Sequence, residues 1–342
     1  MTIKKMAVCA CMILLIAACR PQESQDNKGT LSPPAPLEMS SLKEALSYAR
    51  GVVQDNEWPR TIKYSYEMYD FKTDTFSLED KTFNMKRKPL RIVPHAVGVA
   101  DILWAICPRE RILSFNEYSA DPDFSFISDE VRKSGNIFRS KQTELIIGLN
   151  PDIVFTVFYS DSSFKDKLKQ ANVPFFDLGY FGTISSIESQ ILLLGRIIGE
   201  EGNAEALIKT MNEKIADLKT KLPQMKSRLR VLYYDEGGYI PGKSSNFTSI
   251  CELINVINVG EEKGIKSWSQ IDFETLLKWD PDIIIVPEGS RLKEQLTANK
   301  ILSHAKAVKE NKIYYVPGVY LRVDSQFIIL SANLLAGIVY ER

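Results

Sequence analysis

The sequence predicts an α/β fold of two lobes joined by a single long α-helix, with a ligand cleft between the lobes. Three observations predict this fold. Short apolar strands alternate with helices from Leu90 onward, a helix–strand segment recurs in both halves, and a long amphipathic segment lies between them. Short apolar runs separated by helices are typical of a parallel or mixed sheet covered on both faces, so each lobe is expected to be Rossmann-like. A chain of 342 residues, 44% of them hydrophobic, is long enough for two such lobes.

Residues 1–18 have the layout of a secretory leader. The pair Lys4-Lys5 precedes an apolar run from Met6 to Ala18 that ends in small residues. This run is shorter than the roughly 20 residues of a transmembrane helix, which disfavours an uncleaved signal anchor. A cysteine directly after Ile16-Ala17-Ala18 resembles the lipobox of bacterial lipoproteins. The resemblance implies that the leader is removed and that Cys19 carries the lipid, so the mature chain is anchored to a bacterial membrane outside the cytoplasm.

Composition narrows the function classes further. Residues 19–41 are polar and rich in proline, which predicts a flexible tether. The 43 basic and 43 acidic residues balance, so nucleic-acid binding is not expected. Cys107 and Cys251 lie far apart in the sequence, and we interpret both as buried apolar thiols instead of a disulfide.

The segment 42–83 is expected to form a helix and a β-hairpin ahead of the first lobe. Apolar residues from Leu42 to Val53 recur at helical spacing. From Ile62 to Met68 apolar and polar residues alternate, the pattern of a half-buried strand. The polar stretch Lys72–Asp74 then predicts a turn into a second strand at Thr75–Phe83.

The first lobe is expected over 84–182, connecting helices over 183–223 and the second lobe over 224–342. The predicted elements of the first lobe are strands at Arg91–Val93, Arg111–Phe115, Ile153–Phe158 and Phe175–Phe176, and a helix at Val97–Ile106. Helices are predicted at Ile187–Ile198 and Asn203–Leu222. The second of these has one continuous apolar stripe and would form a rod about 30 Å long between the lobes.

An internal repeat supports two related halves. The segment from Glu144 to Val154 contains a short helix, the dipeptide Pro151-Asp152 and a buried strand, and the segment from Glu274 to Ile284 repeats this order with Pro281-Asp282. Proline disfavours the helical conformation of the residue before it, so each helix is expected to end there. Matching glutamate, proline, aspartate and isoleucine at fixed spacing favour two similar lobes over coincidence.

Residues 75–342 resemble the substrate-binding proteins of ABC importers for iron–siderophore complexes, haem and cobalamin. The resemblance is strongest in Pro89–Pro94, in the two repeated segments, in Ser267–Ile271 and in Lys312–Pro317. It implies a protein that performs no chemistry, has no cofactor of its own and delivers a metal complex to an ABC permease dimer with its ATPase. Which of these ligands is bound, and which membrane holds the anchor, stay open.

The resemblance also implies a docking role for Glu144 and Glu274. In that family the glutamate at the head of each repeated helix binds arginines on the two permease subunits. Two fixed carboxylates on separate lobes suit this task, because arginine binds a carboxylate through two parallel hydrogen bonds. The alternative is that both are acids favoured by the helix macrodipole at an N-terminus.

The family's cleft loops map onto His95, Tyr118, Phe158, Tyr159, Tyr239, Trp268, Tyr320 and Arg322. Aromatic rings offer flat apolar contact to a chelate or macrocycle, and a guanidinium suits an anionic ligand group. Core packing remains the alternative for each aromatic residue. His95 is expected either to ligate iron or, as a structural residue, to be held by a hydrogen bond. With only 2 histidines, a bare zinc or manganese site built from several imidazoles is not expected.

Other functions are disfavoured. The segment Gly237–Ser244 satisfies the P-loop pattern, but Pro241 removes an amide donor, and the following helix is expected only from Thr248. The sequence contains no G-x-S-x-G motif, which disfavours an extracytoplasmic hydrolase. A surface receptor or sensor of the same fold, without a permease partner, remains an alternative.

Overall fold

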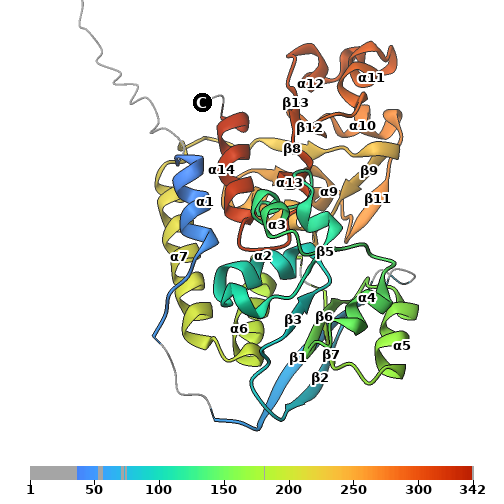
Figure 1. Cartoon of the computed structure of the whole chain (residues 1–342). Helices are drawn as coiled ribbons and strands as arrows, with labels where there is room; N and C mark the ends of the chain where they lie inside the picture. The colour runs from blue at the N-terminus through green and yellow to red at the C-terminus, as the bar shows by residue number, and fades with distance from the viewer. Residues whose placement is uncertain (1–36, 53–56, 71–72, 74, 181, 341–342) are drawn as a thin grey trace, which may run out of the picture. The chain divides into compact units, whose positions relative to one another are not determined.

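The computed structural model describes residues 37–52, 57–70, 73, 75–180 and 182–340 (Figure 1). The expected leader, Cys19 and nearly all of the expected tether lie outside the described residues. In the described part of the chain, no helix is long and apolar enough to cross a membrane.

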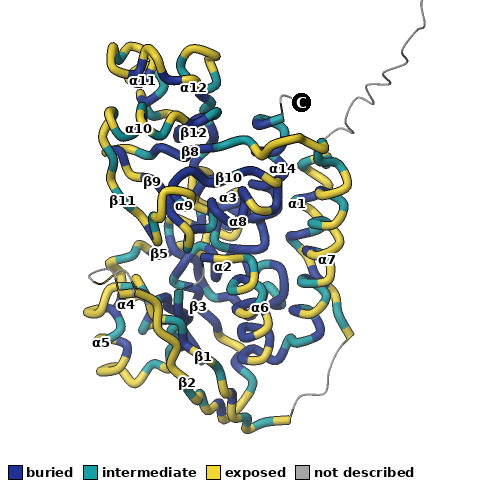
Figure 2. Tube along the Cα trace, turned by 180° about the vertical axis from the view of Figure 1, so that it is seen from behind, coloured by how far each residue is buried: buried dark blue, intermediate teal, exposed yellow. Residues whose placement is uncertain are grey.

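Two parallel sheets organise the chain, one in each half (Figure 1). The sheet of the first half has the order β3 (Ile92–Pro94), β6 (Ile153–Val157), β7 (Phe175–Leu178). The sheet of the second half has the order β10 (Ile257–Asn258), β8 (Arg230–Tyr233), β12 (Ile283–Pro287), β13 (Ile313–Val316). All five residues of β6 and of β12 are buried, as expected for strands covered on both faces. Figure 2 shows β12 in the colour of buried residues. The predicted α/β architecture with buried parallel strands is confirmed.

The helix predicted at Val97–Ile106 and the short helix predicted near Glu144 are present in the first half, together with elements that were not predicted. The helices and short strands are α2 (Val97–Ile106), η1 (Arg109–Arg111), β4 (Phe115–Asn116), η2 (Glu117–Ala120), α3 (Ser128–Ser134), β5 (Ile137–Phe138), α4 (Thr143–Gly148) and α5 (Ser162–Gln170). The strand predicted at Arg111–Phe115 is wrong in its first part, because Arg111 ends a 3-10 turn and only Ile112 bridges to Ile92.

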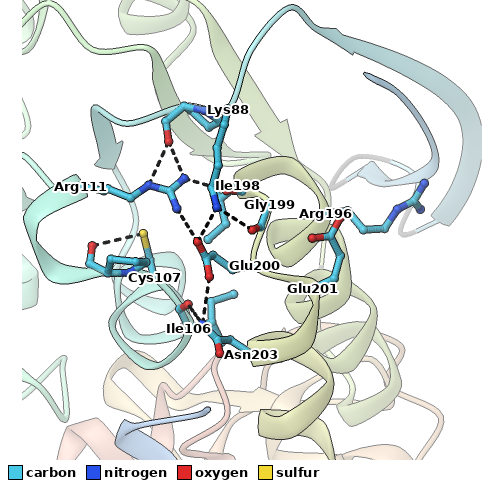
Figure 3. Close-up of polar contacts among 12 residues, drawn as sticks. Lys88, Ile106, Cys107, Arg111, Arg196, Ile198, Gly199, Glu200, Glu201 and Asn203 are labelled. Atoms are coloured by element: carbon cyan, nitrogen blue, oxygen red, sulfur yellow. Dashed lines mark hydrogen bonds and ion pairs between the residues drawn. The ribbon is translucent and has the colours of Figure 1, made fainter. Parts of the chain in front are cut away.

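A buried ion cluster explains that departure (Figure 3). The Arg111 guanidinium, 7% exposed, donates to the carbonyl oxygen of Ile198 at 2.7 Å and to Glu200 Oε1 at 2.7 Å. Glu200 also accepts from Lys88 Nζ at 2.9 Å and from Asn203 Nδ2 at 3.1 Å. The cluster therefore fastens the junction of two helices to the first half, and this tertiary contact outweighs the local preference of an apolar run for a strand.

Those two helices are α6 (Ile184–Ile198) and α7 (Glu201–Thr220), which connect the halves. Gly199, with φ of 70°, ends α6 in the left-handed conformation that glycine adopts without strain. Helix α7 buries Leu207, Met211 and Leu218 and contacts α2, so it packs along the body of the chain and is not a free rod. The described residues form one compact unit, and the largest core cluster contains residues of both sheets.

The second half carries the remaining elements. They are η3 (Glu236–Gly238), β9 (Tyr239–Pro241), α8 (Asn246–Leu253), α9 (Val259–Glu262), β11 (Trp268–Gln270), α10 (Phe273–Trp279), α11 (Leu292–Ala298), η4 (Ile301–His304), α12 (Lys306–Lys309), α13 (Gly318–Leu321) and α14 (Ile328–Val339). The predicted start of α8 at Thr248 is wrong: Ser245 caps the helix, and its hydroxyl accepts the Thr248 N–H at 3.3 Å. Residues 239–241 form a strand paired with β11 and not a loop around phosphate, so the P-loop interpretation fails for a different reason.

The N-terminal segment forms α1 (Met39–Ser47) and a hairpin of β1 (Arg60–Asp70) and β2 (Thr75–Met85). The predicted helix and hairpin are confirmed, although the helix starts earlier and ends at Ser47. The Glu38 carboxylate caps it by accepting the backbone N–H groups of Ser40 and Ser41. Leu42 and Leu46 of α1 are buried, and α1 contacts α2, α7 and α14.

Candidate functional site

A cavity of about 680 Å³ lies at the carboxyl ends of β3 and β6 in the first half. Its walls come from the loop after β3, the loop after β6, helix α5 and the turn η2. Apolar and polar groups share the lining, among them His95, Tyr118, Phe124, Tyr159, Phe164 and Lys167. Ligands of open α/β sheets bind at this edge, because the loops that leave parallel strands meet there.

A smaller cavity of about 290 Å³ lies between the two halves. Phe158, Tyr159 and Tyr180 form its wall on the side of the first half, and Asn246 and Trp268 form the opposite wall. Tyr159 lines both cavities, so the two are adjacent. The Tyr180 hydroxyl donates to the carbonyl oxygen of Ser244 at 2.7 Å and so joins the two walls.

His95 lines the larger cavity as a neutral ring. The ring stacks on Phe164, with centroids 4.1 Å apart, and its Nδ1 atom lies 3.3 Å from Ser160 Oγ. Burial lowers the pKa of His95 to about 4, with a further contribution from nearby Lys165. The Nε2 atom is buried and has no hydrogen-bond partner among the described residues. In this conformation Nε2 is not open to a metal complex in the cavity.

Three expected aromatic residues present open faces to the cavities. Tyr118 is 47% exposed, Tyr159 58% and Trp268 46%, which is unusual for large rings inside a fold and leaves them free to contact a solute. Phe158 is more enclosed, since its ring lies 5.0 Å from that of Tyr159 and 5.0 Å from that of Tyr180.

Of the other residues expected to contact ligand, Arg322 lines a cavity and two tyrosines do not. Arg322 is exposed, lines the smaller cavity, and its guanidinium lies 5.6 Å from the centre of the Phe124 ring on the opposite side. Tyr239 and Tyr320 are not among the residues that line either cavity. Tyr320 packs edge-on against Phe126, with ring centroids 5.1 Å apart.

Sequence reasoning missed the polar groups of the smaller cavity. Asn246 Nδ2 donates to the carbonyl oxygen of Val323 at 2.6 Å, whereas its Oδ1 atom is buried without a partner among the described residues. Asp324 lines the same cavity, and burial raises its pKa to about 7. Neither residue belongs to a motif, so only the folded chain brings them together.

A second carboxyl group lies buried nearby, on α2. Asp101 is 2% exposed and accepts the hydroxyl groups of Ser125 at 2.8 Å and Ser325 at 3.0 Å. Burial raises the pKa of Asp101 to about 8, and the neighbouring Asp324 raises it further. The turn at 324–325 is thereby tied to the first half.

Glu144 and Glu274 lie in the first turns of α4 and α10, and both are exposed. The Glu144 carboxylate accepts a hydrogen bond from Lys167 Nζ at 2.9 Å, which lowers its pKa. Lys167 also lines the larger cavity. Within the described ranges Glu274 makes no ion pair.

Metal and thiol chemistry find no support in the described residues. Cys107 and Cys251 are both buried and free, which confirms the expected apolar thiols. Across the ranges that the structure describes, no three histidine, cysteine, aspartate or glutamate side chains are grouped to hold a metal ion.

Paired α/β halves with two adjacent cavities suit a protein that binds a solute. Residues 97–320 match the periplasmic binding protein family, and the chain belongs to that family.

Known relatives support this assignment. The uncharacterized ABC transporter substrate-binding lipoprotein YvrC of Bacillus subtilis is 24% identical over 262 residues, 74% of this chain and 80% of that protein. A cobalamin-binding protein of Halobacterium salinarum is 22% identical over 244 residues, 70% of this chain and 65% of that protein, slightly under two thirds of its length. The fold is shared with the periplasmic haem-binding protein RhuT of Roseiflexus, with a TM-score of 0.63 and 17% identity over 73% of this chain and 98% of that one.

The family settles the broad function. The chain is a substrate-binding protein of the kind that serves ABC transporters outside the cytoplasm, and the prediction that it is not an enzyme is confirmed by its family. The hydrolase and NTPase interpretations are thereby set aside.

Proposed function

We propose that the chain captures a metal chelate or macrocycle, namely an iron–siderophore complex, haem or a corrinoid, and delivers it to an ABC permease dimer. The adjacent cavities that share Tyr159 carry this proposal. The larger cavity, of about 680 Å³, falls in the usual range of roughly 300–1,000 Å³ for small-molecule sites, and the smaller, of about 290 Å³, lies just below it. The similar proteins described above include a cobalamin-binding and a haem-binding protein, which supports the same ligand classes.

The lining assigns parts of the ligand to parts of the site. Tyr118, Tyr159 and Trp268 supply flat apolar contact to the body of the ligand, with Phe158 behind them. Arg322 meets an anionic group such as a carboxylate or catecholate. Asn246 lines the smaller cavity opposite Tyr159, and its side chain is held by the hydrogen bond to the Val323 carbonyl oxygen. The His95 ring forms part of the wall of the larger cavity and does not bind a metal, because its Nε2 is buried.

Glu144 and Glu274 dock the loaded protein on the permease. Both head a helix of the internal repeat and both are exposed, which is the condition for pairing with arginines of a partner. Such charges set orientation and encounter rate more than raw affinity. Cys19 carries the lipid that keeps the protein at the membrane, as the lipobox resemblance implies.

Uptake by intact cells tests the docking role. The double variant Glu144→Ala/Glu274→Ala is expected to lose uptake while the purified protein binds ligand with unchanged affinity. A double variant at two other exposed acids, Glu205→Ala/Glu213→Ala on α7, is the matched control and should transport normally. Normal uptake by the Glu144/Glu274 variant would favour a surface receptor or sensor that has no permease.

A further inference from the structure

Helix α1 and the residues that follow it take no part in the candidate site. Residues 37–52, called the strap from here on, precede residues 97–320, which match the family, and none of them lines either cavity of the site. Helix α1 nevertheless buries Leu42 and Leu46, which are 2% and 0% exposed. It contacts α2 of the first half, α14 of the second half and the connecting helix α7. The strap therefore touches both halves and the connection between them.

Two buried amide side chains hold the strap on the second half. Asn333 of α14 is 1% exposed; its Oδ1 atom accepts the Leu37 N–H at 2.9 Å, and its Nδ2 atom donates to the Leu37 carbonyl oxygen at 2.9 Å. Gln326 is 0% exposed, and its Nε2 atom donates to the Leu46 carbonyl oxygen at 3.3 Å. The same Nε2 atom donates to the carbonyl oxygen of Asp101, on α2, at 2.8 Å. The Gln326 amide thus joins the strap and both halves at one point.

The end of the strap is held on the first half and on α7. The Ala49 N–H donates to the carbonyl oxygen of Ala105, on α2, at 3.0 Å. The Gly51 N–H donates to the Oδ1 atom of Asn203, on α7, at 2.9 Å. The strap therefore starts on the second half, crosses the first half and ends on the helix that connects the two.

A direct backbone contact between Gly51 and Gly202 fixes this end of the strap on α7. A β-carbon at residue 51 would overlap the Gly202 carbonyl oxygen, and a β-carbon at residue 202 would overlap the Val52 carbonyl oxygen. Only glycine, which has no β-carbon, permits this approach. A single methyl group added on either side would therefore push the strap away from α7.

The strap and the larger cavity lie on opposite sides of the molecule. In Figures 1 and 2, α1 and α7 run along one side, whereas α5, which lines the larger cavity, lies on the other. The connection through α6 and α7 alone would permit hinge rotation of one half against the other. Such a rotation would stretch or break the contacts of a second segment that is fastened to both halves. The strap is such a segment, so it opposes opening and closing of the cleft.

We propose that the strap holds the two halves in one relative orientation, so that the solute enters a cleft that is formed before binding. Buried groups carry this proposal: the side chains of Asn333 and Gln326 and the Gly51–Gly202 contact. A preformed site lowers the cost of ordering that binding must otherwise overcome. The proposal concerns the same cleft as the proposed function and rests on it, but its test needs no ligand, so the failure of one does not decide the other.

Distance measurements between nitroxide labels on the two halves test the proposal in the ligand-free chain. One label is attached at Lys169→Cys on α5 and the other at Gln295→Cys on α11, both at exposed positions. The native Cys107 and Cys251 are buried and so protected from the labelling reagent. The labelled chain with an intact strap should give one narrow distance distribution. A broad distribution in this chain would contradict a fixed orientation of the halves.

A pair of glycine substitutions separates the strap from general effects of an added methyl group. Gly51→Ala should broaden the distribution, because its methyl group displaces the strap from α7. Gly148→Ala is the matched control, because a β-carbon at this exposed position meets no atom within 4 Å, and it should leave the distribution narrow. Gly202→Ala changes the same contact from the side of α7, where alanine favours the helix, and keeps the test available if Gly51→Ala does not fold.

Hydrogen exchange shows whether the strap has left α7. In both strap variants the Ala49 N–H should exchange faster than in the unaltered chain, because its hydrogen bond to Ala105 opens when the strap moves. Faster exchange at Ala49 together with a broader distribution supports the proposal. A distribution that stays narrow although Ala49 exchanges faster would overturn it, and so would exchange at Ala49 that neither variant changes.

Discussion

The two copies of the internal repeat share their scaffold chemistry and differ in what surrounds their glutamates. In both copies the aspartate after proline holds the start of a neighbouring parallel strand: Asp152 accepts the Leu90 N–H at 2.8 Å, and Asp282 accepts the Arg230 N–H at 2.8 Å. Around the glutamates the copies differ. Glu144 is paired with Lys167, which lines the larger cavity, whereas Glu274 makes no ion pair in the described ranges. The two copies therefore share the aspartate that holds a neighbouring strand and differ in the ion pairing of their glutamates.

Of the changes predicted here, replacing the aspartate of either repeat should lower the free energy of unfolding the most. Asp152 also accepts the Arg91 N–H at 3.1 Å and pairs with Arg87, so it satisfies one more amide than Asp282. Asp152→Ala should lower the free energy of unfolding by about 2–4 kcal/mol and Asp282→Ala by about 1–3 kcal/mol. Urea unfolding at neutral pH measures both. An effect of Asp282→Ala larger than that of Asp152→Ala would contradict this account of the frame.

The carboxylates of Asp152 and Asp282 also make the stability of the fold depend on pH in the acid range. Burial alone would raise the pKa of each, but hydrogen bonds and ion pairs outweigh it and lower the pKa of both Asp152 and Asp282. Their contribution is therefore fully present above the unfolded-state pKa of about 3.9 and is lost as pH falls through the folded-state value. The unfolding midpoint of either alanine variant should depend less on pH below 4 than that of the unaltered chain.

Asp101 gives stability the opposite pH dependence to that of Asp152 and Asp282. Its pKa in the folded chain is raised to about 8, above the unfolded value of about 3.9, so the folded state retains the proton. Stability is then highest below pH 4 and falls as pH rises towards 8. Asp101→Asn keeps the hydrogen bonds with Ser125 and Ser325 without a charge, and at pH 8 it should raise the free energy of unfolding by about 1–3 kcal/mol.

Urea unfolding at pH 5 and pH 8 checks this. The groups that face Asp101 are the two serine hydroxyls, Asp324 and, further away, Lys43. Asp166→Asn, at an exposed position on α5, is the control and should leave the pH dependence unchanged. A stability of Asp101→Asn that falls between pH 5 and pH 8 as steeply as that of the unaltered chain would contradict the burial of this carboxyl group.

Replacing Lys167 tests whether its ion pair with Glu144 makes the two glutamates differ in permease docking. If Glu144 docks on a permease arginine, it must first leave Lys167, and an exposed pair of this kind is worth roughly 0–1 kcal/mol. Lys167→Ala should therefore raise the affinity of the ligand-free protein for its permease by up to about 5-fold. Lys278→Ala, one helical turn after Glu274, is the matched control, because no ion pair links those two side chains in the described residues. Equal effects of both variants would remove the asymmetry.

The smallest predicted effect is the change in tryptophan emission when Trp268 is replaced. It is 46% exposed in the wall that the second half contributes to the smaller cavity. Ligand should quench part of the tryptophan emission, and Trp268→Phe should lose that part while the other three of the 4 tryptophans keep theirs. An identical quench in Trp268→Phe would place the ligand away from this wall.

Elements that depend on local sequence could be predicted, and elements that depend on distant contacts could not. The strands β6 and β12 and the helices before them were predicted because local apolar runs and the Pro-Asp dipeptide determine them. The strand predicted at Arg111 failed because a buried pair with Glu200, distant in the sequence, decides that conformation. Of the aromatic residues that the family resemblance implied, Tyr118, Phe158, Tyr159 and Trp268 line the two cavities, whereas Tyr239 and Tyr320 do not.

The polar part of the site could not be predicted from the sequence. Asn246, Asp324 and Tyr180 belong to no motif, and only the folded chain brings them to one cavity. The burial of His95 Nε2 likewise depends on stacking with Phe164, which no sequence pattern indicates.

The most direct test of the central claim is native mass spectrometry of the purified mature chain with haemin, a ferric siderophore and cyanocobalamin. One of these should add a single equivalent, and Tyr159→Ala, which opens the wall that both cavities share, should lose that complex at equal concentration while remaining folded. No mass shift with any of the three, or a complex that Tyr159→Ala retains in full, would contradict capture of a metal complex or corrinoid between the two halves.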